Sequence, residues 1–371
     1  MGRSARARFA ALLAPAGIAV DGNAPHDLRV HDERFFGVVL AGGSLALGES
    51  YMDGWWSCDR IDAFFARLMA AGLDRTAAGV HGGLRRLGAL FFPLGRRSKA
   101  FVIGERHYDL GNELFEAMLD RRMIYSCAYW VDAGSLDDAQ ERKLDLVCRK
   151  LGLKDGQRLL DVGCGWGGLA RFAAERYGVS VVGITVSKEQ AALAARQVRD
   201  FPVEIRLEDY RDLSGTFDAV VSLGMFEHVG PRHHRTFLEV VRRCLREDGL
   251  FLLHTIGTSE TMAAPDPWIL KYIFPESHVP SLAQISRAAD GLFVVEDVHN
   301  FGAFYDPTLM AWNANVEARR ATLPARYDER FFRLWRYYLL SCAGTFRARR
   351  SQLVQFVLSP RGVAGGYAPV R

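Results

Sequence analysis

The sequence contains little cysteine and lacks a long apolar run. Its six cysteines are widely spaced over 371 residues and include no C-x-x-C pair, whereas secreted domains held together by disulfides are rich in cysteine. No uncharged apolar run approaches the roughly 18 to 20 residues that a membrane-spanning helix needs. Residues 1–20 place basic side chains before an apolar run, as signal peptides do, but no convincing cleavage site follows. We therefore expect reduced thiols, a cytoplasmic protein, and a surface helix or a frayed tail at its start.

An excess of charge of one sign is also absent. The 47 basic and 43 acidic residues leave a net charge of only +4, which argues against nucleic acid as the main partner. The sequence has no internal repeat and no low-complexity tract. Because 49% of its residues are apolar, the chain has ample material for the core of a globular protein.

One segment departs from this balance. Residues 75–99 carry six arginines or lysines and no acidic residue, together with a cluster of leucine and phenylalanine. This composition is typical of a segment at the surface of an anionic bilayer. A basic interdomain linker, in which Phe91 and Phe92 pack against a neighbouring domain, is the alternative. The side chains expected near the lipid headgroups are Arg85, Arg86, Arg96, Arg97 and Lys99.

After residue 140, short apolar runs alternate with helical patterns. Helices are predicted at 167–177, 187–198 and 233–245. Strands spaced by helices predict an α/β fold with a doubly wound, mostly parallel seven-stranded sheet. The predicted strands are 158–162, 179–185, 203–209, 217–224, 249–257, 292–298 and 353–359.

The remaining parts of the chain suggest a second, smaller domain. Residues 25–73 mix apolar runs with turn signals and end in a helical pattern, which predicts a small α+β unit. Residues 258–290 and 305–345 are expected to be insertions that cover the top of the sheet. The predicted organisation is an N-terminal domain over 1–92, a linker over 93–105 and a catalytic domain over 106–371.

The glycine loop "LLDVGCGWGGLA" after the first sheet strand predicts a nucleotide-like cofactor. Gly163, Gly165 and Gly168 match the G-x-G-x-x-G spacing of a dinucleotide fold. A nicotinamide enzyme, however, needs an acid at the end of the second strand, and that strand ends in Thr185 with no acid nearby. Asp161 stands two residues before Gly163, which is the arrangement of methyltransferases. The loop therefore favours S-adenosylmethionine (SAM) over NAD.

Nine strings, in order and at consistent separations, extend this interpretation. They are "HYDLGNELFEAMLD", "YSCAYW", "LLDVGCGWGGLA", "VVGITVSKEQ", "MFEHVG", "LLHTIG", "DPWILKYIFP", "HNFGAFYDPTLMAW" and "CAGTFRAR". Together they closely resemble the cyclopropane-fatty-acyl-phospholipid synthases, and the resemblance runs from about Pro25 to the C-terminus. It implies a class I SAM methyltransferase with a Rossmann-like sheet.

The chemistry that the resemblance implies is methyl transfer from SAM to the cis double bond of a phospholipid acyl chain. Proton loss and closure to a cyclopropane follow. The intermediate is a carbocation, so the site must hold the reactants close together and exclude water. Aromatic faces stabilise positive charge without attacking it; packing in the core is the alternative for many of them. The aromatic candidates are Tyr129, Trp130, Trp268, Tyr272, Phe274, Phe301, Phe304 and Tyr305.

The resemblance also implies a base, a bound bicarbonate ion. The residues that match its site are Cys127, Glu227, His254, Ile256 and Tyr305. Ile256 can contribute only its backbone. Three of the others have a structural alternative: His254 as a satisfied core histidine, Glu227 as a helix cap, and Cys127 as a small buried residue whose thiol nothing activates.

The positions that match the cofactor site are spread over several loops. Ser187 and Gln190 also form the S-x-x-Q pattern of a capping box, and "EDYRD" is equally compatible with a solvated loop. No metal site is expected. The expected cofactor residues are Tyr125, Ser126, Asp161, Gly163, Gly165, Gly167, Thr185, Ser187, Gln190, Asp209 and Tyr210.

Other outcomes of the same fold stay open. A related enzyme forms the same cation and ends in a methyl-branched or methylene-bearing chain, and another methylates the nitrogen of a small amine. A non-catalytic lipid-binding protein is the alternative from a different class. The resemblance further implies peripheral association with the inner face of the membrane, a homodimer, and an N-terminal domain linked to dimerisation and lipid engagement.

Overall fold

A computed structural model describes residues 4–73, 110–261, 265–275 and 277–371, and these fall into two compact units. The helical unit consists of residues 4–73, 265–275 and 305–351. The sheet unit consists of residues 110–261, 277–304 and 352–371. The basic segment 75–99, with its expected lipid contacts, and the expected linker 93–105 lie outside the described residues.

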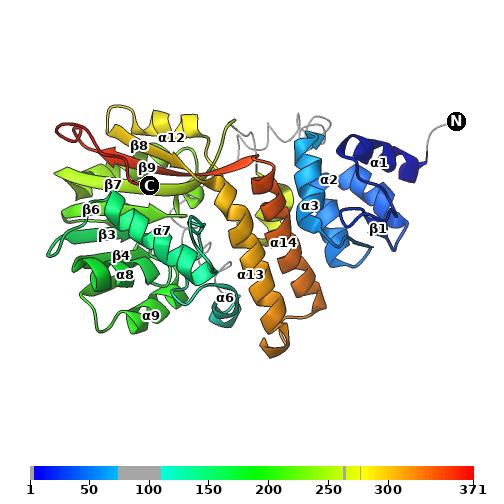
Figure 1. Ribbon diagram of the computed structural model, residues 1–371, viewed down its shortest axis with the longest axis horizontal. Coiled ribbons are helices and arrows are strands. Elements are labelled where there is room, and N and C mark those ends of the chain that lie inside the picture. Colours follow the sequence, from blue (N-terminus) through cyan, green and yellow to red (C-terminus); the bar gives the residue numbers. More distant parts are fainter. Residues whose placement is uncertain (1–3, 74–109, 262–264, 276) are drawn as a thin grey trace. The chain divides into compact units, whose positions relative to one another are not determined.

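A seven-stranded sheet forms the middle of the sheet unit (Figure 1). Its order is β5-β4-β3-β6-β7-β9-β8, which is the doubly wound arrangement that the sequence predicts. The first five of these strands pair in parallel, whereas β8 pairs antiparallel with β9. The strands are β3 (Arg158–Val162), β4 (Ser180–Thr185), β5 (Val203–Leu207), β6 (Phe217–Leu223), β7 (Leu245–Thr258), β8 (Val294–Asn300) and β9 (Ser351–Ser359).

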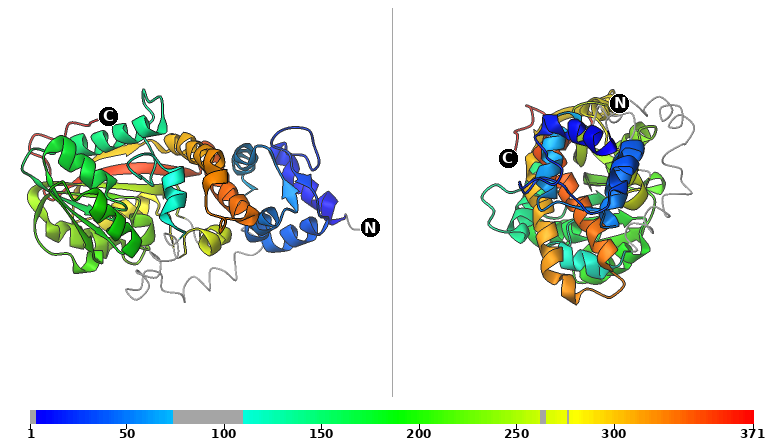
Figure 2. Two further views of the ribbon diagram at one scale, coloured as in Figure 1. Left: turned by 90° about the horizontal axis from the view of Figure 1, so that it is seen from below. Right: turned by 90° about the vertical axis from the view of Figure 1, so that its right-hand side faces the viewer.

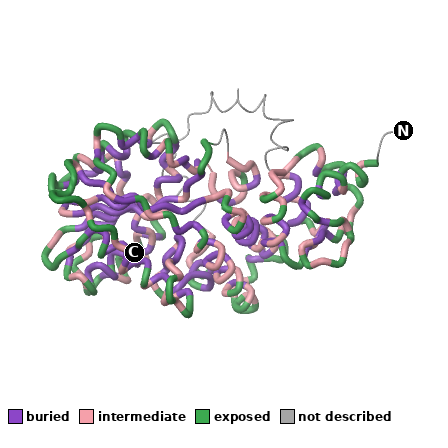
Figure 3. Tube along the Cα trace, turned by 45° about the horizontal axis from the view of Figure 1, so that its top comes forward, coloured by how far each residue is buried: buried purple, intermediate pink, exposed green. Residues whose placement is uncertain are grey.

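Helices cover both faces of this sheet (Figures 1 and 3), and its central strands are buried on both sides. One buried cluster joins the strands to α10 (His234–Cys244) and α12 (Leu282–Ala289). The other joins them to α7 (Leu136–Lys150) and α8 (Gly168–Tyr177). The remaining helices of this unit are α6 (Asn112–Met118) and α9 (Lys188–Gln197), with short turns η2 (Tyr210–Asp212), η3 (Phe226–His228) and η4 (Gly302–Phe304).

The helical unit combines the start of the chain with two later segments. Helices α13 and α14 run side by side (Figures 1 and 2), and α14 packs on α3 and α2. A two-stranded antiparallel sheet of β1 and β2 completes the unit. Its elements are α1 (Ala5–Leu13), η1 (Ala14–Ala16), β1 (Arg29–Val30), α2 (Arg34–Met52), β2 (Trp56–Ser57), α3 (Ile61–Ala70), α11 (Pro267–Tyr272), α13 (Tyr305–Arg319), η5 (Arg320–Thr322) and α14 (Glu329–Arg347).

The N-terminal apolar run forms a packed helix rather than a frayed tail. Phe9 and Leu13 of α1 are buried, and the Phe9 ring meets the edge of the Phe35 ring at 5.0 Å. Helix α2 is the one helix of the described residues that is long and apolar enough to cross a membrane. Half of that stretch is buried within the unit, and its backbone is broken at Gly43. All six cysteines are free.

A buried carboxylate ties the beginning of the chain to its end. Asp62 of α3 is 1% exposed and accepts hydrogen bonds from Arg60 (2.9 and 2.7 Å) and from Arg347 of α14 (2.6 Å). Arg347 also binds both oxygens of Asp306 at 2.8 Å. The two helices approach closely at Gly344, where a Cβ atom would lie 2.5 Å from the Asp62 carbonyl oxygen. Any larger side chain at residue 344 would therefore push α3 and α14 apart.

We predict that Asp62→Asn lowers the free energy of unfolding by about 2 kcal/mol at pH 7. Burial by itself raises the pKa of Asp62, but the hydrogen bonds from Arg60 and Arg347 outweigh it and lower the pKa to about 2. A depressed pKa stabilises the fold above the unfolded value near 3.8, and this contribution disappears as pH falls towards 2. Urea denaturation of both proteins at several pH values measures the difference.

Asp59→Asn is the matched control. Asp59 pairs with Arg29, and both side chains are about half exposed, so this change should cost less than about 1 kcal/mol. Equal losses for the two variants would contradict a special role for the buried carboxylate.

Candidate active site

The glycine loop lies at the carboxyl edge of the sheet, directly after β3. Its residues Gly163, Gly165 and Gly167 all have positive φ angles, of 86°, 54° and 80°, which glycine adopts without steric cost. The backbone N–H groups of Gly163 and Cys164 both donate to the carbonyl oxygen of Ile184, at 3.0 and 2.9 Å. A Cβ atom on Gly163 would lie 2.7 Å from the Cβ of Met225. The loop is therefore fastened to β4 on one side and lies against the chain after β6 on the other.

The predicted cofactor residues after β4 form a compact polar cluster. The Thr185 hydroxyl donates to Gln190 Oε1 at 2.8 Å and accepts from the Ser187 N–H at 3.2 Å. The Ser187 hydroxyl caps α9 by accepting from the Gln190 N–H at 3.3 Å. Only half of the predicted capping box forms, because the Gln190 side chain bonds Thr185 instead of the Ser187 backbone. This bond fixes the Gln190 amide at the end of β4.

The segment after β5 is not a fully solvated loop, because two of its residues are buried. Asp209 is 3% and Tyr210 8% exposed. Both Asp209 oxygens accept from the guanidinium of Arg211, at 2.8 and 2.7 Å. The Tyr210 ring packs edge-on against Phe237 at 5.3 Å. Asp209 is therefore held as a carboxylate, and Tyr210 forms part of the core beneath it.

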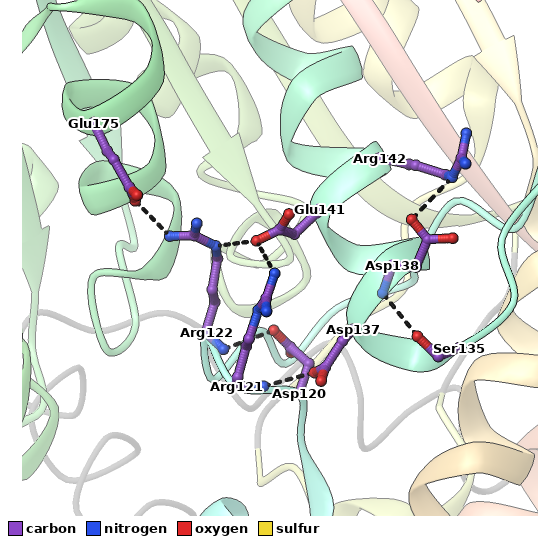
Figure 4. A network of polar contacts seen from close by, with 9 residues as sticks. All are labelled: Asp120, Arg121, Arg122, Ser135, Asp137, Asp138, Glu141, Arg142 and Glu175. Carbon is purple, nitrogen blue, oxygen red and sulfur yellow. Dashed lines mark hydrogen bonds and ion pairs between the residues drawn. The ribbon is translucent and has the colours of Figure 1, made fainter.

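A network of charged residues fixes the chain that leads to Tyr125, Ser126 and Cys127 (Figure 4). The Asp120 carboxylate accepts from the backbone N–H groups of Arg122 and Ile124, both at 2.9 Å. The Arg122 side chain binds Glu141 of α7 at 2.9 Å and Glu175 of α8 at 3.1 Å. This network anchors residues 120–124 to both helices and so determines where the next three residues lie.

Helix α7 holds the same segment from beneath with two polar side chains. The Gln140 amide donates to the carbonyl oxygens of Ser126 and Ile124, at 2.9 and 3.3 Å. The Lys143 ammonium donates to the Ser126 hydroxyl at 2.8 Å. Both side chains are fully buried. Neither residue was predicted to belong to the site, although a glutamine and a lysine on the apolar stripe of helix 136–150 are a recognisable signal.

Asp161 lies at the end of β3 beside this pair. It is 2% exposed, and among the described residues no group bonds its Oδ2 atom. Burial raises the pKa of Asp161 to about 7, and the Lys143 ammonium opposes this shift. A buried carboxylate oxygen without a donor is a fitting acceptor for an ammonium or hydroxyl group of a ligand. The residues at this edge thus fit a cofactor that carries such groups.

Glu227 is placed by β7 rather than by a helix. Its Oε1 atom accepts from the Ile256 N–H at 2.7 Å, and the next helix, α10, begins at His234 without a side-chain cap. Glu227 is 6% exposed, and among the described residues no group bonds its Oε2 atom. Burial raises the pKa of Glu227 to about 7. The side chain therefore changes protonation near neutrality in a dry setting.

His254 lies on the same strand as Ile256, two residues earlier, opposite Leu223 at the end of β6. Its Nδ1 atom lies 3.2 Å from the Gln355 amide, and no described residue bonds its Nε2 atom. Burial, with the Lys143 and Lys150 ammonium groups, lowers the pKa of His254 well below its ordinary value. His254 is thus a neutral imidazole that is only half satisfied, unlike an ordinary core histidine.

The two remaining predicted anion ligands differ in setting. Cys127 is fully buried, and its thiol donates to the Ala128 carbonyl oxygen at 3.3 Å. Tyr305 begins α13 in the helical unit, where its ring stacks on Phe346 at 4.4 Å.

Within the sheet unit, the structure brings together the segments that hold Ser126, Gly163, Glu227 and His254. Gly224 connects them, because its N–H donates to the His254 carbonyl oxygen at 2.9 Å and the residue lies against Ser126.

The predicted aromatic residues divide between the units. In the sheet unit, the Tyr129 ring meets Phe301 at 5.4 Å and Phe304 at 5.5 Å, and Phe301 lies 5.8 Å from the His254 ring. In the helical unit, Trp268 packs against Tyr337 at 4.6 Å. The first group therefore lines the surroundings of His254, and Trp268 belongs to a packed core.

The chain is similar in sequence and in fold to known proteins. The family model described as mycolic acid cyclopropane synthetase matches residues 96–356. Cyclopropane-fatty-acyl-phospholipid synthase of Escherichia coli (strain K12) is 52% identical over 361 residues, which are 97% of this chain and 94% of that protein. The solved cyclopropane synthase MmaA2 from Mycobacterium tuberculosis is 30% identical, with a TM-score of 0.67 over 72% of this chain and 99% of that one.

A second solved relative carries a ligand. It is the mycolic acid cyclopropane synthase CmaA1 in complex with SAH and CTAB, 34% identical to this chain. Its TM-score is 0.66, over 71% of this chain and 99% of that one. The chain is thus similar in sequence and in fold to SAM-type methyltransferases.

We predict that Glu227→Gln removes a pH dependence of folding. Because the folded pKa of Glu227 is raised from about 4.5 to about 7, its carboxyl group favours the folded state at low pH, and this contribution is lost as pH rises to 7. The free energy of unfolding of the variant, relative to the unaltered protein, should therefore increase by about 3 kcal/mol between pH 4 and pH 8. Denaturant titrations without added ligand measure it, and a constant difference between the two proteins would refute the buried, protonated carboxyl group.

Proposed function

The chain belongs to the mycolic acid cyclopropane synthetase family, and from this premise we propose how its site works. The protein is a cyclopropane-fatty-acyl-phospholipid synthase, which transfers a methylene group from SAM to the cis double bond of a phospholipid acyl chain. The single observation that carries this function is the 52% identity, over 97% of the chain, to an enzyme of that name. The buried acid and imidazole at the carboxyl edge of the sheet support it independently.

The cofactor site is formed by four loops of one sheet edge. When bound, SAM supplies an electrophilic methyl group on a sulfonium. The glycine loop allows its backbone to approach the cofactor closely, Asp161 and Ser126 offer an acceptor and a donor, and the Thr185–Gln190 pair presents an oriented amide. The full set proposed to hold SAM is Tyr125, Ser126, Asp161, Gly163, Gly165, Gly167, Thr185, Ser187, Gln190, Asp209 and Tyr210.

We propose a bicarbonate ion as the base, held by Glu227, His254, Cys127 and Tyr305, with Ile256 acting through its backbone. When bound, this ion accepts the surplus proton. The buried Glu227 Oε2 and His254 Nε2 atoms, which no described residue bonds, fit a small oxyanion that can both donate and accept hydrogen bonds. Glu227 can itself carry a proton, because its pKa is near 7, so it can donate to such an ion.

The backbone of Ile256 acts indirectly in this arrangement. Its N–H is bonded to Glu227 at 2.7 Å, so it aims the carboxyl group. The Ile256 side chain has no polar atom. We propose that Ile256 orients Glu227 and that its side chain is replaceable by another apolar residue of similar size.

The rival outcomes of the same chemistry differ in where the proton goes. A methyl-branched chain needs added reducing equivalents, and N-methylation of an amine needs no carbocation. A buried acid and a neutral imidazole at one sheet edge favour proton removal, which leads to ring closure or to a methylene-bearing chain. The 52% identity to a cyclopropane-fatty-acyl-phospholipid synthase favours ring closure. Peripheral association with the inner face of an anionic membrane, through residues 75–99, and assembly as a homodimer remain proposals that rest on composition and on the family resemblance.

We predict that cells expressing the protein accumulate phospholipids whose acyl chains have gained one CH2 unit and lost a double bond. Glu227→Gln should bind SAM within about twofold of the unaltered protein and lose at least about 100-fold of its turnover, because a positioned proton-transfer group contributes about that much. Mass spectrometry of extracted lipids, with calorimetry for SAM, measures both.

Glu239→Gln, on the exposed face of α10, is the control and should keep its activity. A chain that gains two further hydrogens indicates the methyl-branched product. Unchanged lipids together with a methylated soluble amine would show that the lipid substrate is wrong.

We predict that replacing Arg85, Arg86, Arg96 and Arg97 by Gln weakens co-sedimentation with anionic liposomes by at least about 100-fold at low salt, since each basic residue near such a surface contributes about 1 kcal/mol. The four Arg→Lys changes keep the charge and serve as the control. Binding by the unaltered protein that ignores anionic lipid content and salt would rule out the electrostatic contact.

A further inference from the structure

Lys143 is a charged residue in the core of the sheet unit that the proposed mechanism does not use. Its side chain is fully buried on α7, and its ammonium donates to the Ser126 hydroxyl at 2.8 Å. An isolated ammonium in such a place destabilises the fold unless it is compensated, and an apolar side chain of similar length would avoid this cost. The charges of the buried Asp120 and Asp161 carboxyl groups offset part of this cost, but among the described residues the hydrogen bond of Lys143 goes to Ser126, so charge balance alone does not explain where its ammonium points.

We infer that Lys143 is a positioning residue for the cofactor: it fixes the Ser126 hydroxyl so that this group donates its hydrogen to the carboxylate of the amino-acid part of SAM. The inference rests on the proposed SAM site and adds to it a residue that the sequence analysis did not identify. Lys143 acts through Ser126 and does not itself touch the cofactor.

The hydrogen-bonding chemistry of the pair determines the direction of the Ser126 hydroxyl. An ammonium can only donate, so the Ser126 oxygen is the acceptor in this bond. Its own hydrogen must then point to a different atom, and among the described residues no acceptor for it is recorded. A ligand atom that accepts a hydrogen bond satisfies this group.

The position of Ser126 is fixed from two directions by one face of α7. While Lys143 binds its hydroxyl, the Gln140 amide donates to its carbonyl oxygen at 2.9 Å. Gln140 and Lys143 are three residues apart, so they lie one above the other on the helix. The hydroxyl is thereby held with little rotational freedom, which is what a preorganised ligand contact requires.

The charge of Lys143 indicates which part of the cofactor binds to the Ser126 hydroxyl. The amino-acid part of SAM carries a carboxylate and an ammonium, whereas the adenosine part carries no anion. The positive charge of Lys143 favours the carboxylate at Ser126. Asp161, whose carboxyl group interacts with the same lysine, keeps a buried oxygen that no described residue bonds, so it is a complementary acceptor for the ammonium. The Ser126 hydroxyl, beside Lys143, and the Asp161 carboxyl group thus fit the carboxylate and the ammonium of an amino acid, respectively.

Calorimetry with two nucleosides tests this assignment. S-adenosylhomocysteine contains the amino-acid part, and 5′-methylthioadenosine shares the adenosine and the sulfur but lacks it. Lys143→Met should weaken binding of S-adenosylhomocysteine by about 10-fold to 100-fold, the usual effect of losing a hydrogen bond to a charged group. Binding of 5′-methylthioadenosine should change by less than about twofold. A merely structural role of Lys143 would weaken both.

Lys150→Met is the matched control, because Lys150 is also fully buried on α7 but lies 3.0 Å from His299 Nδ1 and 3.6 Å from Asp297. It should leave both affinities unchanged. Ser126→Ala provides a second test that leaves the helix intact, and it should reproduce the selective loss. The double variant should bind S-adenosylhomocysteine about as weakly as the weaker single variant, since both changes remove one contact.

Equal losses for the two nucleosides, no loss for either, or multiplying effects in the double variant would each overturn the inference. Failure of the unaltered protein to bind S-adenosylhomocysteine would instead overturn the proposed function on which it rests. The two failures are therefore distinguishable.

Discussion

The exclusion of water from the carboxyl edge of the sheet is the constraint on which the site depends. A carboxyl group, an imidazole and an ammonium are all buried there, and burial opposes the charged form of each. The fold compensates with single, well-directed hydrogen bonds, such as the one from the Ile256 backbone to Glu227. What remains near neutrality is a neutral imidazole, a carboxyl group that is partly protonated and one buried ammonium. Such a water-poor setting suits chemistry on an apolar chain, because water would trap the reactive cation.

Much of the fold could be predicted from the sequence because it follows from local periodicity. All seven sheet strands occur where apolar runs predict them, and the comparisons agree with the SAM-type fold. The glycine loop was equally readable, since positive φ angles restrict the residue type. The N-terminal run was predictable only as helix or tail; its packing through Phe9 against Phe35 decides for the helix.

The parts that could not be predicted depend on which of several nearby groups a polar side chain bonds in the folded protein. The pattern of Ser187 and Gln190 predicts a capping box, but the nearby Thr185 hydroxyl takes the glutamine oxygen. Lys143 and Gln140 stand out as polar residues on an apolar helix stripe, but their partners could not be predicted, because only the position of the 124–126 backbone makes them hydrogen-bond donors to that segment. Glu227 was suggested by the family resemblance, whereas its hydrogen bond to the Ile256 backbone on β7 depends on the register between β6 and β7.

The ion pair between Asp62 and Arg347 has a consequence for how the chain is made. The helical unit gathers segments from both ends of the sequence, so α3 leaves the ribosome long before the α14 face that will cover it. At about 5 to 20 residues per second, the intervening stretch of the chain takes roughly 15 to 60 s to synthesise. During that interval, aromatic side chains of residues 4–73 that α14 later buries stay exposed. Nascent chains of this protein should therefore depend on chaperones more than those of a protein whose domains are contiguous in sequence.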